Sequence, residues 1–408
     1  MQIRRVKYKD IEEIPQLKIN TSFKTNFQGS APAPFIGRFG YPHVNIGVLS
    51  PQFSGDTSHY DSPRLWSKEN AAIGNIASLR YGLVNSRSQA SVKDVQKGSR
   101  FLNIVREVGM AKNSVELEVS LQKAPQLQFK PEKEIIPFGP QAAIRSAQIT
   151  ANPFVDSRVE RVVADTDLKA APAIVSLYQK GFEESSLNKL LSVGGVGLKE
   201  NRKLVPTRWS ITAVDDTIGK QLIKEIKDFP VGEYCAYFGG SWGNYYLLLF
   251  FPEVWSYELF ETYLASPVNP WSKNGYIYST DYENYDGRKE YAEETAGGYY
   301  ACRISILEKM KELKRQGSCL ALRFITPEYN IPLGVWVCRE ATRKSLREKP
   351  ITFADQGLMM KYAEELIKRK FGFDINVLLK ESKLLKLKKE QKRLFEFSLP
   401  THLYYSIF

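Results

Sequence analysis

The sequence is poor in the residues that build disulfides and zinc sites. Its 408 residues contain four cysteines and three histidines, and no two cysteines form a C-x-x-C pair. Cysteines spaced so widely predict reduced, partly buried thiols, and they give a zinc site little support. We therefore expect no metal site and no cofactor.

Long apolar runs are also missing. The longest candidate, residues 245–252, has the length of a strand, whereas a membrane-spanning helix needs about 20 apolar residues. Charged residues follow the first five positions, which predicts no secretion signal. No G-K-[ST] triplet occurs, which excludes a Walker phosphate-binding loop. We expect a cytoplasmic protein without a membrane partner.

Positive charge and aromatic residues, by contrast, are abundant. The chain has 57 Lys and Arg against 45 Asp and Glu, a formal net charge of +12, with 43% hydrophobic and 12% aromatic residues. This composition indicates a folded chain, long enough for two or three domains, with an affinity for polyanions such as nucleic acid.

Helical and strand patterns alternate irregularly, which predicts an α+β fold of mixed helices and short sheets. Alternating apolar residues predict a strand at 115–121, and two apolar runs around GGSWGN predict a hairpin at 233–251. The sequence predicts further strands at 319–325 and 333–337, and helices around 155–163 and 168–181. The composition shifts between residues 276 and 294, as expected at a domain junction.

The C-terminal tail concentrates the positive charge. Residues 380–393 hold seven Lys or Arg against two Glu, and we expect this segment to be helical. Such a segment attracts the phosphates of nucleic acid. The predicted nucleic-acid-binding residues are Lys383, Lys386, Lys388, Lys389, Lys392 and Arg393.

A short hook follows these cations. Leu394 and Phe397 are three residues apart, so a single helical turn places both on one side. Gln391, three residues before Leu394, is expected on the same side, where it adds a polar group to the two apolar side chains. This pattern resembles the PCNA-interacting peptide, or PIP box, although its second aromatic residue, Phe395, precedes Phe397 instead of following it. The resemblance implies that these four residues bind the sliding clamp. The alternative is an amphipathic helix whose Leu and Phe dock on the protein's own body.

Two groups are candidates for catalysis. Arg38, His43 and Asn45, with Arg64, could grip phosphate and move protons. The alternative is that His43 is an ordinary hydrogen-bonded residue of a glycine-rich loop.

The second group is Arg208 with Asp215 and Asp216. Adjacent carboxylates could hold a divalent ion for phosphodiester hydrolysis. The alternative is that one of them is the N-cap of a helix and the other is solvated.

Aromatic residues beside basic ones offer surfaces on which unpaired bases could stack, and Trp66 and Trp209 are examples. Most rings must nevertheless belong to the core. No helix-turn-helix, zinc-finger or RNP pattern occurs, so base-specific recognition is not predicted.

Three blocks together resemble the archaeal Nre family of DNA repair proteins: SAPAPFIGRFGYPHVNIGVLSP, DSPRLWSKENAAIGNIASLRYGLVNSR and KLVPTRWSITAVDDTIG. The resemblance implies an N-terminal region, 1–288, a smaller C-terminal α/β region, 289–379, and the basic tail, 380–408. It also implies a role in DNA damage repair linked to PCNA and DNA. The resemblance assigns no catalytic residues to this chain. The alternatives are a metal-dependent DNA-processing enzyme, the one case that would need a divalent metal, and a clamp-independent nucleic-acid-binding protein.

Overall fold

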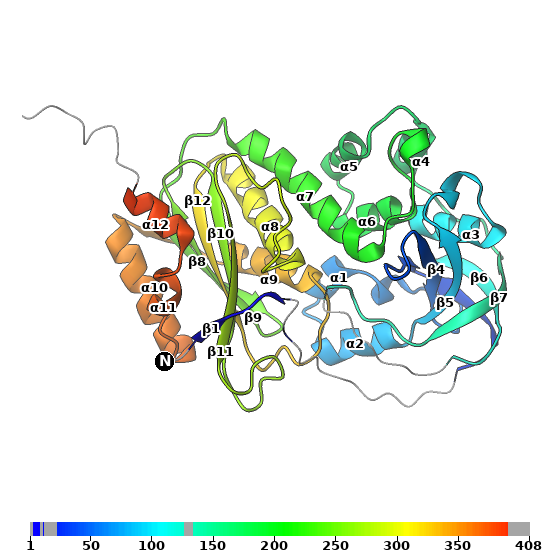
Figure 1. The fold of residues 1–408 in the computed structure, drawn as a ribbon, viewed down its shortest axis with the longest axis horizontal. Helices are drawn as coiled ribbons and strands as arrows, with labels where there is room; N and C mark the ends of the chain where they lie inside the picture. The colour runs from blue at the N-terminus through cyan, green and yellow to red at the C-terminus, as the bar shows by residue number, and fades with distance from the viewer. Residues whose placement is uncertain (1–2, 9–10, 12–22, 126–133, 391–408) are drawn as a thin grey trace, which may run out of the picture.

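The computed structural model describes residues 3–8, 11, 23–125 and 134–390. Helices pack around two mixed β-sheets, one of six strands and one of seven, which occupy opposite halves of the elongated molecule (Figure 1). The predicted α+β class is therefore confirmed. In the part of the chain that is described, no helix is long and apolar enough to cross a bilayer.

The six-stranded sheet is built by the first part of the chain, in the order β2-β6-β7-β5-β4-β3. Its strands are Asn26–Ala31 (β2), Ala33–Ile36 (β3), His43–Ser50 (β4), Val84–Ser91 (β5), Val115–Leu121 (β6) and Gln141–Ile149 (β7). In β6, buried residues alternate with more exposed ones, which confirms the strand predicted from its alternating sequence.

The seven-stranded sheet has the order β1-β11-β10-β12-β9-β8-β13. Its strands are Ile3–Arg5 (β1), Tyr234–Ser241 (β8), Asn244–Phe251 (β9), Ser256–Tyr263 (β10), Tyr276–Glu283 (β11), Ser318–Ile325 (β12) and Ile351–Phe353 (β13). The predicted hairpin is confirmed as β8 and β9, and the strand at 319–325 as β12. Since β12 and β13 follow residue 288, the two predicted regions share this sheet, and the divisions at 288 and 379 stay predictions.

Helices cover both faces of the seven-stranded sheet. One face carries α7 (Thr207–Ile226), α8 (Gly297–Leu313) and α9 (Trp336–Arg347), and the other α10 (Gln356–Phe371), α11 (Asn376–Leu379) and α12 (Lys383–Glu390). In β9, Leu248 and Phe250 join the first core, whereas Leu247 and Leu249 join the second. A strand buried on both faces is apolar at successive positions, as this run is.

The remaining helices cover the six-stranded sheet and connect the two halves. They are α1 (Pro63–Lys68), α2 (Ile73–Tyr81), α3 (Arg100–Met110), α4 (Ser157–Ala164), α5 (Ala170–Gln179) and α6 (Glu184–Ser192). Helices α4 and α5 confirm the predictions around 155–163 and 168–181. Helix α6 lies against both α3 and α7, and so links the two halves of the molecule.

Two predictions from local patterns are wrong. Residues 333–337 form no strand, because Gly334 has a φ of +88° and α9 begins at Trp336. A short apolar run fits a strand as well as the start of a buried helix, and the left-handed turn at Gly334 decides for the helix. Asp215 and Asp216 are not N-caps, because α7 begins at Thr207 and carries both in its interior.

Candidate functional site: a basic groove and the C-terminal helix

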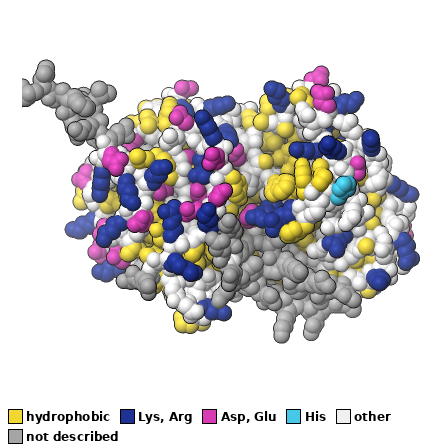
Figure 2. Space-filling model, viewed as in Figure 1, with side chains coloured by type: hydrophobic (Ala, Val, Ile, Leu, Met, Phe, Trp, Pro, Cys, Tyr) yellow, Lys and Arg dark blue, Asp and Glu magenta, His cyan; other side chains and the backbone are white. Residues whose placement is uncertain are grey.

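A basic groove with a volume of about 550 Å³ lies where the β3–β4 loop, α7 and the segment before α8 meet. In the space-filling view, Lys and Arg side chains gather beside exposed hydrophobic ones in the middle of the drawn face, between the two halves of the molecule (Figure 2). The groove is lined by Arg38, Glu134, Arg208, Trp209, Thr212, Ala213, Asp216, Lys220, Arg288, Lys289, Glu290, Tyr291 and Tyr300.

Positive charge predominates in this groove, with five cations against three carboxylates. Two of the carboxylates are neutralised by ion pairs. Arg208 donates to Glu134, with its Nε 2.6 Å from Oε2. Asp216 accepts from Nζ of Lys220 at 2.6 Å and from Nη2 of the buried Arg303 at 2.7 Å. The groove therefore suits an anionic ligand.

Exposed aromatic rings surround the mouth of the groove. Trp209, in the first turn of α7, is 46% exposed, and its ring centroid lies 5.4 Å from that of Tyr41. Phe39 is 67% exposed, with the guanidinium of Arg38 4.5 Å from its ring centroid, and Tyr291 is 44% exposed. Rings and cations thus alternate on one surface, an arrangement that suits stacked bases and their phosphates.

Of the predicted catalytic residues, Arg38, Arg208 and Asp216 line the groove. His43 and Asn45 are not among the lining residues. His43 begins β4 on the exposed surface, and Asn45 lies partly buried within the same strand. Arg64 is not a lining residue either and pairs with Glu184. The structure therefore brings together three of the seven candidates, and a catalytic role for any of them stays a prediction.

Asp215 points away from the groove and is fully buried. Both of its carboxylate oxygens accept hydrogen bonds from Nη2 of Arg339, each at 2.8 Å. Burial, helped by the nearby Glu184 carboxylate, outweighs Arg339 and raises the pKa of the Asp215 carboxyl to about 6. Asp215 and Asp216 therefore have different arginine partners and do not face a common site.

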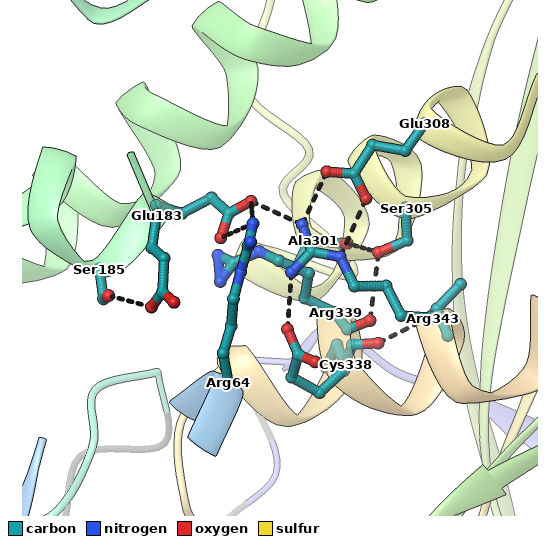
Figure 3. Close-up of polar contacts among 12 residues, drawn as sticks. Arg64, Glu183, Ser185, Ala301, Ser305, Glu308, Cys338, Arg339 and Arg343 are labelled. Carbon is teal, nitrogen blue, oxygen red and sulfur yellow. Dashed lines mark hydrogen bonds and ion pairs between the residues drawn. The ribbon is translucent and has the colours of Figure 1, made fainter. Parts of the chain in front are cut away.

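Asp215 belongs to a buried network of arginines and carboxylates between α1, α6, α8 and α9. Arg343 lies at its centre and pairs with Glu184 at 2.5 Å, Glu308 at 2.7 Å and Glu340 at 2.6 Å. Arg64 reaches the same Glu184 from α1, at 3.1 Å. Figure 3 shows Arg64, Arg339, Arg343 and Glu308 of this network. Burial alone would raise the pKa of Glu184, but the surrounding arginines outweigh it and hold that pKa well below its usual value.

The sequence interpretation named Arg64 but missed Arg339 and Arg343 of this network. Arg339 and Arg343 stand four residues apart on α9, which places both on one face of the helix. Arginines are seldom buried without partners, but the polar residues beside this pair, Glu340, Thr342 and Lys344, gave no sign that it is buried. Glu134 lies within a proline-rich stretch, residues 124–140, where no pattern marks it.

No metal site is assigned to these residues. Across residues 3–8, 11, 23–125 and 134–390, no three His, Cys, Asp or Glu side chains lie close enough together to hold an ion. The four cysteines are free thiols and three are buried, as the sequence predicts. Burial raises the pKa of the Cys302 thiol to about 12, which keeps it protonated at neutral pH.

The first part of the predicted tail is a helix fixed to the body. Leu384 and Leu385 of α12 are buried in the core of the seven-stranded sheet. The buried Glu258 of β10 caps this helix, because it accepts hydrogen bonds from Oγ of Ser382 at 2.5 Å and from the backbone N–H groups of Lys383 and Leu384, each at 2.9 Å. Helix α12 is thereby anchored at its start.

The predicted nucleic-acid-binding cations of the tail fall into two groups. Lys383, Lys386 and Lys389 are exposed on α12. Lys388 is largely buried: its Nζ lies 2.6 Å from Glu253 and 3.8 Å from the ring centroid of Phe251. Lys392 and Arg393 lie outside the described residues, as do the predicted clamp-binding residues Gln391, Leu394, Phe395 and Phe397.

Comparisons with known proteins cover nearly the whole chain. The family model described as "Archaeal Nre, N-terminal" matches residues 8–272, and "Archaeal Nre, C-terminal" matches residues 283–397. DNA repair protein NreB of Archaeoglobus fulgidus is 33% identical over 387 residues, which cover 94% of this chain and 95% of that protein. DNA repair protein NreA of Haloferax volcanii is 36% identical over 325 residues, 78% of this chain and 77% of that protein. No solved structure matches the chain.

Proposed function

The chain belongs to the archaeal Nre family, and we propose that it is a DNA repair factor that docks on the sliding clamp PCNA through residues 391–397 and contacts DNA through its basic surface. The repair role comes from the names of the relatives, which are DNA repair proteins. The clamp and DNA contacts come from the motif and the charge of this chain.

The anchored α12 is the observation that carries the clamp proposal. Its buried leucines and its cap at Glu258 hold the helix on the body up to Glu390, the residue before Gln391. The motif therefore begins one residue beyond a helix that is fixed on the body. Docking of this kind would raise the local concentration of the protein at clamp-bound DNA to roughly millimolar.

Leu394 and Phe397 should supply most of the clamp affinity. Full burial of each apolar side chain is worth roughly 1.5–3 kcal/mol. Replacement of both by alanine should therefore weaken binding to the PCNA of the source organism by at least about 100-fold in a calorimetric titration.

Leu387→Ala is the matched control for this titration. Leu387 is a 39% exposed leucine on α12, ahead of the motif, and its replacement should leave clamp affinity unchanged. Equal affinity of the wild type and the Leu394→Ala/Phe397→Ala variant would refute the clamp proposal. The protein would then be a clamp-independent nucleic-acid-binding protein if it still bound DNA.

A further inference from the structure

We propose that the basic groove at the start of α7 binds an unpaired segment of a DNA strand, with one base stacked on Trp209 and the neighbouring phosphates near Arg38 and Lys289. This inference rests on the DNA contact in the proposed function, and it names the surface and the form of DNA that make the contact.

Trp209 differs from every other tryptophan of the chain. Of the six tryptophans, all of them described, Trp209 is 46% exposed while none of the other five is more than 8% exposed. Trp66, the other tryptophan considered from the sequence, is buried against Trp336 and cannot reach a ligand. A half-exposed indole leaves apolar surface in contact with water in the unbound protein. When a flat partner covers the ring, that surface is removed from water, which favours binding.

The rings beside Trp209 extend the stacking surface. Tyr41 packs against Trp209 at 5.4 Å between centroids with an interplanar angle of 52°. Tyr291, across the groove, stacks on Tyr300 at 5.7 Å and 26°. Aromatic faces accept any base, so such a surface binds single strands with little sequence preference.

The charges of the groove favour a phosphate backbone. The carboxylates of Glu134 and Asp216 are already neutralised by Arg208, Lys220 and Arg303, so they repel an incoming phosphate only weakly. Arg38 of the β3–β4 loop and the exposed Lys289 line the same groove as Trp209 and Tyr291, whereas Arg288 is paired with Asp281 at 3.2 Å. The volume of about 550 Å³ lies within the roughly 300–1,000 Å³ of such sites.

The same features disfavour intact duplex DNA. In a duplex the base faces are stacked on one another, so Trp209 would meet only backbone and base edges. A single strand, or a nucleotide turned out of a duplex, presents the free face that the ring requires.

The scaffold holds Trp209 in place. Two turns beyond it, Asp215 ties α7 to α9 through Arg339, and Asp216 ties it to α8 through Arg303. A stacking ring on such a fixed helix loses little conformational freedom when a base binds.

Fluorescence anisotropy of a labelled oligothymidylate with the full chain tests this inference. Trp209→Ala should weaken binding roughly 5- to 150-fold, because stacking on an aromatic side chain contributes that much per base. Trp209→Phe should restore much of the loss. Phe154→Ala, at a 59% exposed ring that does not line the groove, should leave the affinity unchanged.

Acrylamide quenching gives an independent readout. Since the other tryptophans are buried, quenching of the native fluorescence reports mainly on Trp209. The oligothymidylate should protect it from acrylamide, and a duplex of equal length should protect it less.

The outcomes separate this inference from the proposed function. If the oligonucleotide binds equally well to wild type and Trp209→Ala, the groove inference fails while the DNA contact stands. If neither single-stranded nor duplex DNA binds, both fail, and the clamp titration decides what remains of the proposed function. Tighter binding of the duplex than of the single strand would overturn the choice of an unpaired strand.

Discussion

Helix α7 separates two clusters of arginines and carboxylates that use the same chemistry differently. Asp215 faces the buried network, where Arg339, Arg343, Glu184 and their neighbours satisfy one another away from water. Asp216, the next residue, faces the groove, where its partner Lys220 is about half exposed. Two adjacent residues of α7 therefore lie in different surroundings, Asp215 in the buried network and Asp216 in the surface groove.

The comparison shows that charged residues of this chain have two different roles. In the buried network the charges are paired with each other, and removal of one leaves another in a low dielectric without compensation. In the groove the Lys220–Asp216 pair reaches solvent, contributes little to stability, and can rearrange when an anion arrives. The first cluster fixes the helices, and the second offers a binding surface.

The largest expected effect is on stability, and it follows from replacing Arg343 at the centre of the buried network. Arg343→Met leaves Glu184, Glu308 and Glu340 without their shared partner, and should lower the free energy of unfolding by about 3–5 kcal/mol. Lys220→Met, in the groove, should lower it by less than about 0.5 kcal/mol. Denaturant unfolding measures the change in free energy of unfolding for both variants. Equal changes would show that the two clusters do not differ in their contribution to stability.

A second prediction uses the pKa of Asp215. Because this pKa is about 6 in the folded protein and near its ordinary value in the unfolded chain, the folded state binds more protons between about pH 4 and pH 6. Asp215 should therefore reduce stability progressively as the pH rises through that window, by on the order of 2–3 kcal/mol. In Asp215→Asn this component should vanish, and identical pH profiles of the two proteins would contradict it.

A third prediction concerns Glu258, a buried carboxylate that is satisfied without an arginine. Glu258→Ala removes the cap of α12 and should cost this helix about 0.5–2 kcal/mol, seen as faster amide exchange over residues 383–390. Glu258→Gln retains an acceptor oxygen and should lose less protection. Unchanged exchange in Glu258→Ala would show that the buried leucines alone hold the helix.

The smallest effect on stability is expected at the groove's exposed cation. Lys289→Ala should change the free energy of unfolding by no more than about 0.5 kcal/mol. It should nevertheless reduce the slope of log affinity for the oligonucleotide against log salt by about one, because one phosphate contact is lost. Lys361→Ala, an exposed lysine on α10 behind the sheet, is the control, and should leave the slope unchanged.

The sequence predicts the parts of the fold that depend on local pattern. Alternation predicted β6, and the apolar runs predicted the β8–β9 hairpin. It does not predict where α9 begins, because the apolar run at 333–337 fits either structure until tertiary packing decides.

The groove could be predicted only in pieces. Arg38, from the phosphate-binding group, and Arg208, from the group with Asp215 and Asp216, line the same groove, as does Trp209. Glu134 and the residues at 288–300 come from distant segments that no local pattern joins to them. Nor could spacing reveal that Asp215 and Asp216 face opposite sides, because that depends on which helices pack against α7.

Hydrogen exchange with and without a single-stranded oligonucleotide tests the central claim most directly. If the groove is the working surface and the network is scaffold, the DNA should slow exchange in residues 37–42, in the first turns of α7 and in residues 288–291, and leave α9 unchanged. Protection confined to other parts of the chain, with these three segments unaffected, would contradict the account.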